Sequence, residues 1–98
     1  MAFMEISTVP IGTGSTSLSQ HVATVVSIIR NSGLPYKLHD MGTTVQGEAS
    51  ELFALATKLH EAMFISDIKR VYTVIKLDDR RDKHVSMGQK TKSVEEKL

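Results

Sequence analysis

The chain has 98 residues, 41% of them hydrophobic, and a formal net charge of +1. This length suits one compact domain with a thin core, and the lack of cysteine excludes disulfides, thiolate catalysis and cysteine-based zinc sites. No apolar run approaches the roughly 20 residues that a membrane-spanning helix requires. The N-terminus MAFMEISTVP lacks the basic residues of a signal peptide, so we expect a cytoplasmic protein that does not contact the membrane.

The first third of the chain predicts a strand followed by a helix. Residues 3–11 are rich in β-branched side chains with a period of two, which indicates a strand. Residues 17–32 read as a helix, with Ser17 and Gln20 forming a capping box and Ser19 as a rival cap. One apolar stripe at helical spacing should face the core, and it consists of Leu18, Val22, Val25, Val26 and Ile29.

The middle of the chain predicts a hairpin and a second helix. Residues 36–40 and 43–48 read as short strands joined by a tight turn, in which Gly42 suits a positive φ. Ser50 is the expected cap of a helix that runs to about Met63. Its apolar stripe consists of Leu52, Leu55, Ala56, Leu59 and Met63.

The last third predicts a strong strand and a polar end. Residues 69–78 form the clearest strand of the sequence. The charged run of residues 78–84 is either a solvated loop or a set of charges that pair across a subunit boundary. Residues 87–98 could make a short terminal helix, polar nearly all round, which needs a partner or frays.

These elements predict an α+β fold of the ferredoxin-like βαββαβ type, over a single domain of residues 1–98. Right-handed crossovers place both long helices on one face of a four-stranded antiparallel sheet and leave the other face bare. The side chains of this open face follow from the alternation along each strand, and they are Glu5, Ser7, Val9, His39, Thr44, Glu48, Tyr72, Val74 and Lys76.

The mixed polar and apolar character of this open face allows two interpretations. One is an ordinary solvated sheet face. The other, which we favour, is self-association through the face, with a small molecule bound near it. A nucleic-acid partner would require a denser basic stripe with stacking aromatic residues, and the chain has no tryptophan and only 5% aromatic residues.

Catalytic and metal-binding signatures are missing from the sequence. The four histidines, at positions 21, 39, 60 and 84, lack the spacing of metal ligands, so we expect no metal and no cofactor. No serine lies in a G-x-S-x-G elbow, and the Gly12-x-Gly14 turn is too short for a dinucleotide site. An enzyme that uses His39 or His84 with nearby carboxylates has no further support, so the chain is predicted not to be an enzyme.

Three segments together resemble the thiamine-binding protein family. They are the run Val9-Pro10-Ile11-Gly12-Thr13 leading to Ser17-Leu18-Ser19, the segment Gly42-Thr43-Thr44-Val45-Gln46-Gly47-Glu48, and Arg70-Val71-Tyr72-Thr73 followed by Arg81-Asp82-Lys83-His84. The resemblance spans nearly the whole chain. It implies a ferredoxin-like subunit that forms homodimers or homotetramers, some of which bind thiamine or a related pyrimidine without catalysis. The alternative is a structural or regulatory homo-oligomer with no small-molecule ligand.

The chemistry of thiamine suggests which residues of this chain would bind it. The thiazolium cation favours a carboxylate or an aromatic face, which Glu5, Glu48 and Tyr72 could supply. The aminopyrimidine requires paired donors and acceptors. The predicted ligand-binding residues are therefore Ser7, His39, Thr43, Thr44, Glu48 and Tyr72. Lys76 on the same face would repel the cation.

Overall fold

The computed structural model describes residues 1–14, 18–65 and 67–98. Its elements follow the predicted order and begin and end close to the predicted residues, although the terminal helix is shorter than expected. In chain order they are β1 (Ala2–Ile11), α1 (Ser19–Ser32), β2 (Tyr36–His39), β3 (Gly42–Gly47), α2 (Ala49–Ala62), β4 (Arg70–Asp79) and α3 (Gln89–Glu95).

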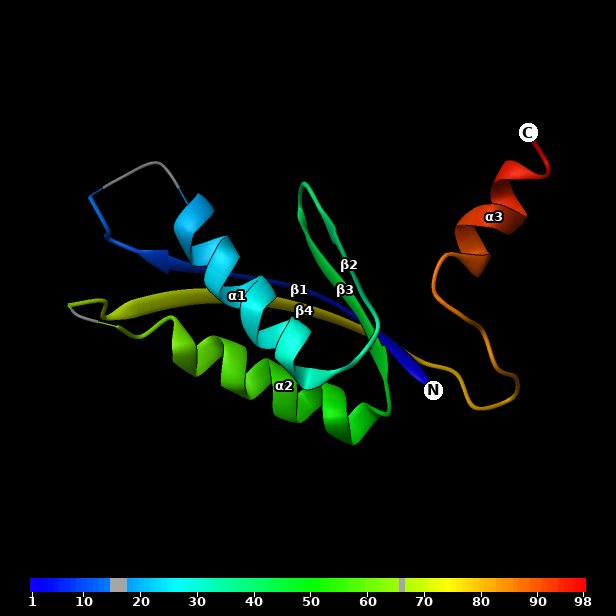
Figure 1. Ribbon diagram of the computed structural model, residues 1–98, viewed down its shortest axis with the longest axis horizontal. Coiled ribbons are helices and arrows are strands. Elements are labelled where there is room, and N and C mark those ends of the chain that lie inside the picture. Colours follow the sequence, from blue (N-terminus) through cyan, green and yellow to red (C-terminus); the bar gives the residue numbers. More distant parts are fainter. Residues whose placement is uncertain (15–17, 66) are drawn as a thin grey trace.

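The four strands form one antiparallel sheet in the order β2-β3-β1-β4. Met4 of β1 lies opposite Val45 of β3 and Leu77 of β4. Figure 1 shows α1 and α2 side by side in front of the sheet, with α3 beyond one end of it. This arrangement confirms the ferredoxin-like α+β fold.

The core lies between the sheet and the two long helices. Met4 and Ile6 of β1 are almost fully buried, and the whole predicted stripe of α2 is buried with them. The stripe of α1 is only partly buried, because Val25 and Ile29 enter the core whereas Val22 is 37% exposed. A pocket of about 340 Å³ lies beside Leu18 and Val22 at the N-terminal end of α1.

The starts of both long helices differ from the prediction. Glu48, not Ser50, is the N-cap of α2, because β3 ends at Gly47 and Glu48 keeps an extended conformation. Its N–H donates to Oε1 of Glu51 at 3.2 Å, and its side chain accepts from the Glu51 N–H, which completes a capping box. Leu18 is the N-cap residue of α1 and makes no side-chain capping bond, while the proposed cap Ser17 lies outside the described residues.

The helix positions alone predicted that the other face of the sheet would be bare, but part of this open face is covered. The segment that follows β4 returns to this face and is held there by Gln46 of β3, which is only 6% exposed. The Gln46 side chain donates to the carbonyl of Val85 at 3.3 Å and accepts from the N–H of Met87 at 3.1 Å. The alternation along β3 predicts which face of the sheet Gln46 occupies. Its bonds to the backbone of Val85 and Met87 could not be predicted, because such contacts between distant residues leave no periodic pattern in the sequence.

Candidate functional site

The strand register places four polar side chains in one row across the open face. Lys37 of β2 lies opposite Thr44 of β3, Thr44 lies opposite Glu5 of β1, and Glu5 lies opposite Lys76 of β4. Opposite residues in an antiparallel pair share a face, with Cβ atoms about 4.5–5.5 Å apart. The row therefore has a carboxylate and a hydroxyl at its centre and a cation at each end.

His39 joins the centre of this row from the end of β2. Its Nε2 lies 3.1 Å from the hydroxyl of Thr44 and 3.7 Å from Oε2 of Glu5. The three side chains are only partly buried, so their polar atoms remain available to a ligand. An imidazole, a hydroxyl and a carboxylate within this distance provide both donors and acceptors in one place.

A groove of about 500 Å³ covers this polar cluster. Its floor includes Phe3 of β1, and its far wall comes from the segment that precedes and begins α3. The size lies within the range of small-molecule sites. The residues around it are Phe3, Glu5, Lys37, His39, Thr44, Lys76, Leu77, Asp78, Ser86, Met87, Gly88, Lys90 and Thr91.

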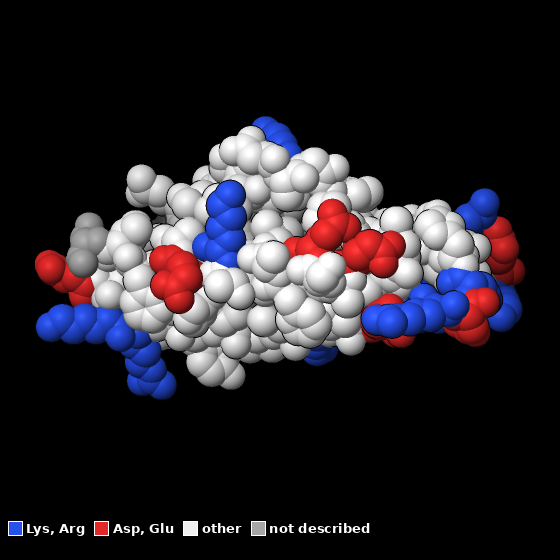
Figure 2. Space-filling view, turned by 90° about the horizontal axis from the view of Figure 1, so that it is seen from below, with Lys and Arg blue, Asp and Glu red and all other residues white. Residues whose placement is uncertain are grey.

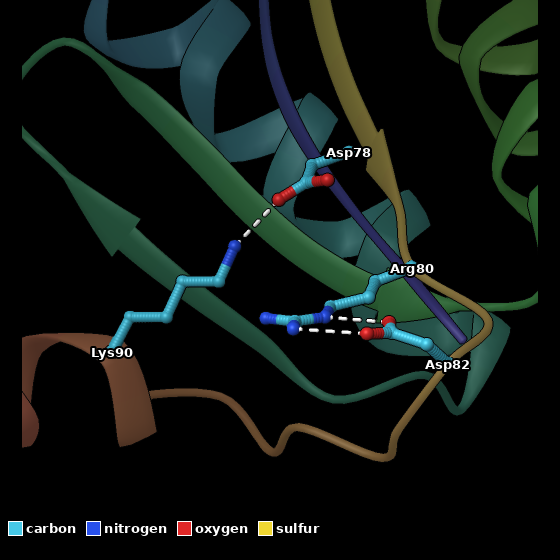
Figure 3. Close-up of polar contacts among 4 residues, drawn as sticks. All are labelled: Asp78, Arg80, Asp82 and Lys90. Carbon is cyan, nitrogen blue, oxygen red and sulfur yellow. Dashed lines mark hydrogen bonds and ion pairs between the residues drawn. The ribbon is translucent and has the colours of Figure 1, made fainter.

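Lys90 of α3 fixes the far wall to the sheet. Its Nζ lies 2.5 Å from Oδ2 of Asp78 and 5.6 Å from the centre of the Phe3 ring, and Figure 3 shows the side chain reaching from α3 toward β4. The ion pair is more than half exposed at both partners, so alone it contributes little to stability. Together with the two bonds of Gln46, it makes the groove a composite of the sheet and the C-terminal segment.

The charged run after β4 pairs within the chain. Arg80 makes two hydrogen bonds to Asp82, at 2.6 and 3.0 Å, as the paired dashed lines in Figure 3 show. Arg81 binds Oδ2 of Asp79 at 2.7 Å. These bonds to arginine hold the pKa of Asp79 and that of Asp82 below the ordinary aspartate value.

Two of the predicted ligand-binding residues lie in the groove. His39 and Thr44 are in contact with each other and line it, and Glu5, weighed earlier only as a partner for the cation, is the carboxylate beside them. Phe3 was overlooked, although its alternation with Met4 places it on the same face as Glu5. Met87 and Lys90 carried no signal, because they lie in a polar segment without periodicity.

The other four predicted residues lie elsewhere. Thr43 is 3% exposed and lies opposite Ile6, so it points to the helix side of the sheet, away from Thr44. Thr43 and Ser7 both line the smaller cavity beside α1. Tyr72 is on the open face but 59% exposed and beyond the groove, and Glu48 caps α2 instead of extending β3.

A second polar cluster on the helix side has a structural role. The hydroxyls of Thr8 and Thr73 lie 2.7 Å apart, and Nδ1 of His60 lies 2.7 Å from the Thr73 hydroxyl. His60 also packs edge-on against Phe64, with ring centres 5.4 Å apart. The chain of bonds satisfies a buried threonine at the boundary of the core. Among the described residues, no three histidine, aspartate or glutamate side chains come together in a group that could hold a metal ion.

The comparisons with known proteins agree with the fold and with the family suggested by the sequence. No helix within the described ranges is long and apolar enough to cross a membrane. The chain is 39% identical to the UPF0045 protein YqgV of Bacillus subtilis, covering 100% of this chain and 98% of that protein. It is 38% identical to a UPF0045 protein of Methanothermobacter thermautotrophicus, with full coverage of both.

A solved structure extends the likeness to three dimensions. The hypothetical protein MJ1052 of Methanocaldococcus jannaschii superposes with a TM-score of 0.86 at 27% identity, over 97% of this chain and 96% of that one. Residues 4–95, which include most of β1, the other three strands and α3, match the model of a family described as "Thiamine-binding protein". The chain therefore belongs to the thiamine-binding protein family.

Proposed function

We propose that this protein is a cytosolic, non-catalytic binding protein for thiamine or a related pyrimidine or thiazolium compound, and that it acts as a homodimer or homotetramer. The observation that carries the proposal is the cluster of Glu5, His39 and Thr44 in a groove of small-molecule size. Membership of a family described by thiamine binding supports the same ligand class.

The groove offers a separate environment for each part of such a ligand. A thiazolium ring carries a permanent positive charge, which the Glu5 carboxylate and the Phe3 ring can both attract. An aminopyrimidine presents an amino donor beside ring-nitrogen acceptors, which His39 and Thr44 can match. Thr44 lies within hydrogen-bond distance of His39, but Glu5 approaches the same ring nitrogen, Nε2, so the carboxylate does not orient the imidazole as in a catalytic triad, and the arrangement favours binding.

Calorimetric titration of thiamine into the wild type and two variants tests this assignment. Glu5→Gln removes the groove carboxylate that is not paired with Lys90 and should weaken thiamine binding by about tenfold, because it deletes the acidic partner in the polar cluster. Glu48→Gln makes the same chemical change outside the groove and should leave the affinity within about twofold.

The outcomes of this titration test separately whether thiamine is the ligand and whether the groove is its binding site. No heat from the wild type at millimolar thiamine would reject the ligand and leave the alternative of an oligomer without one. Equal losses from Glu5→Gln and Glu48→Gln would reject the groove, because the second residue lies at the start of α2.

A further inference from the structure

Strand β4 is a long edge strand, and no other strand of the described residues pairs with its outer side. The order β2-β3-β1-β4 leaves β2 and β4 at the two edges, and β4 is ten residues long whereas β2 has four. On a strand paired on one side, every second residue directs its N–H and C=O outward. Proteins protect such edges by proline, bulges, short length or charged side chains, and of these β4 has charged side chains, with Lys76 the one inside the strand. Strand β4 contains neither proline nor glycine, and all ten of its residues are in register with β1.

Exposed apolar side chains flank this edge on both faces of the sheet. Tyr72 and Val74 on the open face are 59% and 41% exposed, and Ile75 on the helix side is 42% exposed. Phe53 and Phe64 of the α2 region, 56% and 42% exposed, add to the helix side. Phe64 packs edge-on against His60, which reaches Thr73 of β4. Phe53 lies two helical turns before His60 on the same side of α2.

The charges of β4 differ between its two ends. Figure 2 views the molecule from the side on which α2 lies in Figure 1, and acidic and basic side chains cluster at both ends of the long axis while others lie between them. Strand β4 has Arg70 at its start and Asp78 and Asp79 at its end, with Lys76 between them. A strand that is basic at one end and acidic at the other is complementary to itself when it runs antiparallel.

We propose that β4 pairs antiparallel with β4 of a second copy about a twofold axis at Val74, which joins two four-stranded sheets into one of eight strands. This inference deepens the self-association part of the proposed function. In this register Arg70 lies opposite Asp78 of the second copy, and Val71 opposite Leu77. Lys90 contacts Oδ2 of Asp78, and the other carboxylate oxygen can accept from the Arg70 guanidinium.

The neighbouring registers are worse for a physical reason. The twofold that relates adjacent antiparallel strands is perpendicular to the sheet, so opposite residues share a face, and the axis must pass beside a residue rather than between two. An axis at Thr73 sets Arg70 against Lys76, and an axis at Ile75 sets Arg70 against Arg80. Of these three axes, only the one at Val74 places opposite charges together, and it seats Lys76 against Tyr72, where its stem can cover the ring.

Disulfide trapping tests the register directly, because the chain has no cysteine of its own. Val74→Cys places the two thiols opposite each other at the axis, within the Cα separation that a disulfide allows. Mild oxidation should therefore give a covalent dimer in most of the protein. Thr73→Cys and Ile75→Cys are matched controls and should cross-link at least about fivefold more slowly, since their partners lie about two residues, or roughly 7 Å, away along the strand. Faster trapping of either control than of Val74→Cys would overturn the register.

Charge reversal tests the pairing without a covalent bond. Arg70→Asp sets two pairs of like charges across the interface and should raise the dimer dissociation constant at least about tenfold by analytical ultracentrifugation. The double variant Arg70→Asp with Asp78→Arg restores complementary pairs and should recover most of the affinity. Lys58→Asp makes the same charge change on an exposed part of α2 and should have no effect. A wild-type monomer at hundreds of micromolar, or a double variant no better than the single one, would overturn the proposal.

The same samples distinguish this inference from the ligand assignment. If calorimetry detects no thiamine binding but Val74→Cys still cross-links, the ligand assignment is wrong and the β4 interface stands. If the protein binds thiamine but does not dimerise, the β4 interface is wrong and the groove stands, because the residues that line it belong to one chain.

Discussion

At the scale of single residues, the ligand affinity of the groove depends on the balance between Glu5 and Lys76. The two residues are opposite each other on β1 and β4, so Lys76 competes with a bound cation for the Glu5 carboxylate. Lys76→Met keeps the length of the side chain and removes the charge. We expect thiamine to bind about two- to fivefold more tightly to this variant, as a partly exposed charge of this kind contributes about 0.5–1 kcal/mol. Calorimetry with Lys58→Met as the control would show whether the gain is local, and unchanged binding would exclude a cation next to Glu5.

The arginine partners of the loop after β4 make a prediction about pH. The pKa of Asp79 is lowered first of all by its hydrogen bond to Arg81, and that of Asp82 by its bond to Arg80. A carboxylate whose folded pKa is lowered stabilises the fold above its unfolded pKa, and this contribution disappears as the pH falls through the folded value. Carbon-detected NMR titration should give both groups midpoints below the usual value of about 3.9. Arg81→Gln should raise the midpoint of Asp79 alone, and a parallel rise at Asp82 would contradict the separate pairs.

At the scale of elements, one amide side chain joins the buried Val85 and the Lys90 ion pair in holding the C-terminal segment to the sheet. Gln46 binds Val85 and Met87 while buried, whereas α3 itself contributes no buried residue. Gln46→Leu removes both bonds, each of which contributes about 1 kcal/mol. Amide hydrogen exchange at Met87 should therefore accelerate at least about tenfold, while exchange in β1 stays slow. Gln20→Leu on α1 is the control, and an unchanged rate at Met87 in the Gln46 variant would assign the attachment to Lys90 instead.

The same comparison of elements shows what local pattern can and cannot predict. The stripe of α2 was predicted completely because five apolar residues repeat over three turns and all meet the same sheet face. The stripe of α1 was only half right, since burial depends on what lies opposite, and a cavity lies beside Val22. The cap of α2 was misplaced by two residues because a glutamate in a capping box performs the role usually given to serine.

At the scale of the whole molecule, the sequence predicted the fold, whereas half of the groove could not be found in it. Alternation along β1, β2 and β3 was enough to place Glu5, His39 and Thr44 on one face, because the strand register is set by the buried residues between them. The other wall consists of Ser86 to Thr91, which have no apolar period and reach the groove through the contacts of Gln46 and Lys90. Thr43 is polar but points to the core side of the sheet, a position that residue type alone does not reveal.

The central position of β1 has a consequence for how the chain folds during synthesis. Strand β1 is made first, yet its partners are β3, which begins at residue 42, and β4, which ends at residue 79. Contacts this distant in sequence slow folding, because a long loop must close before they stabilise anything. On the ribosome, Met4 and Ile6 therefore remain without their full set of neighbours until four-fifths of the chain has been made. A nascent chain of this protein therefore exposes the apolar side of its first strand until the last strand has emerged.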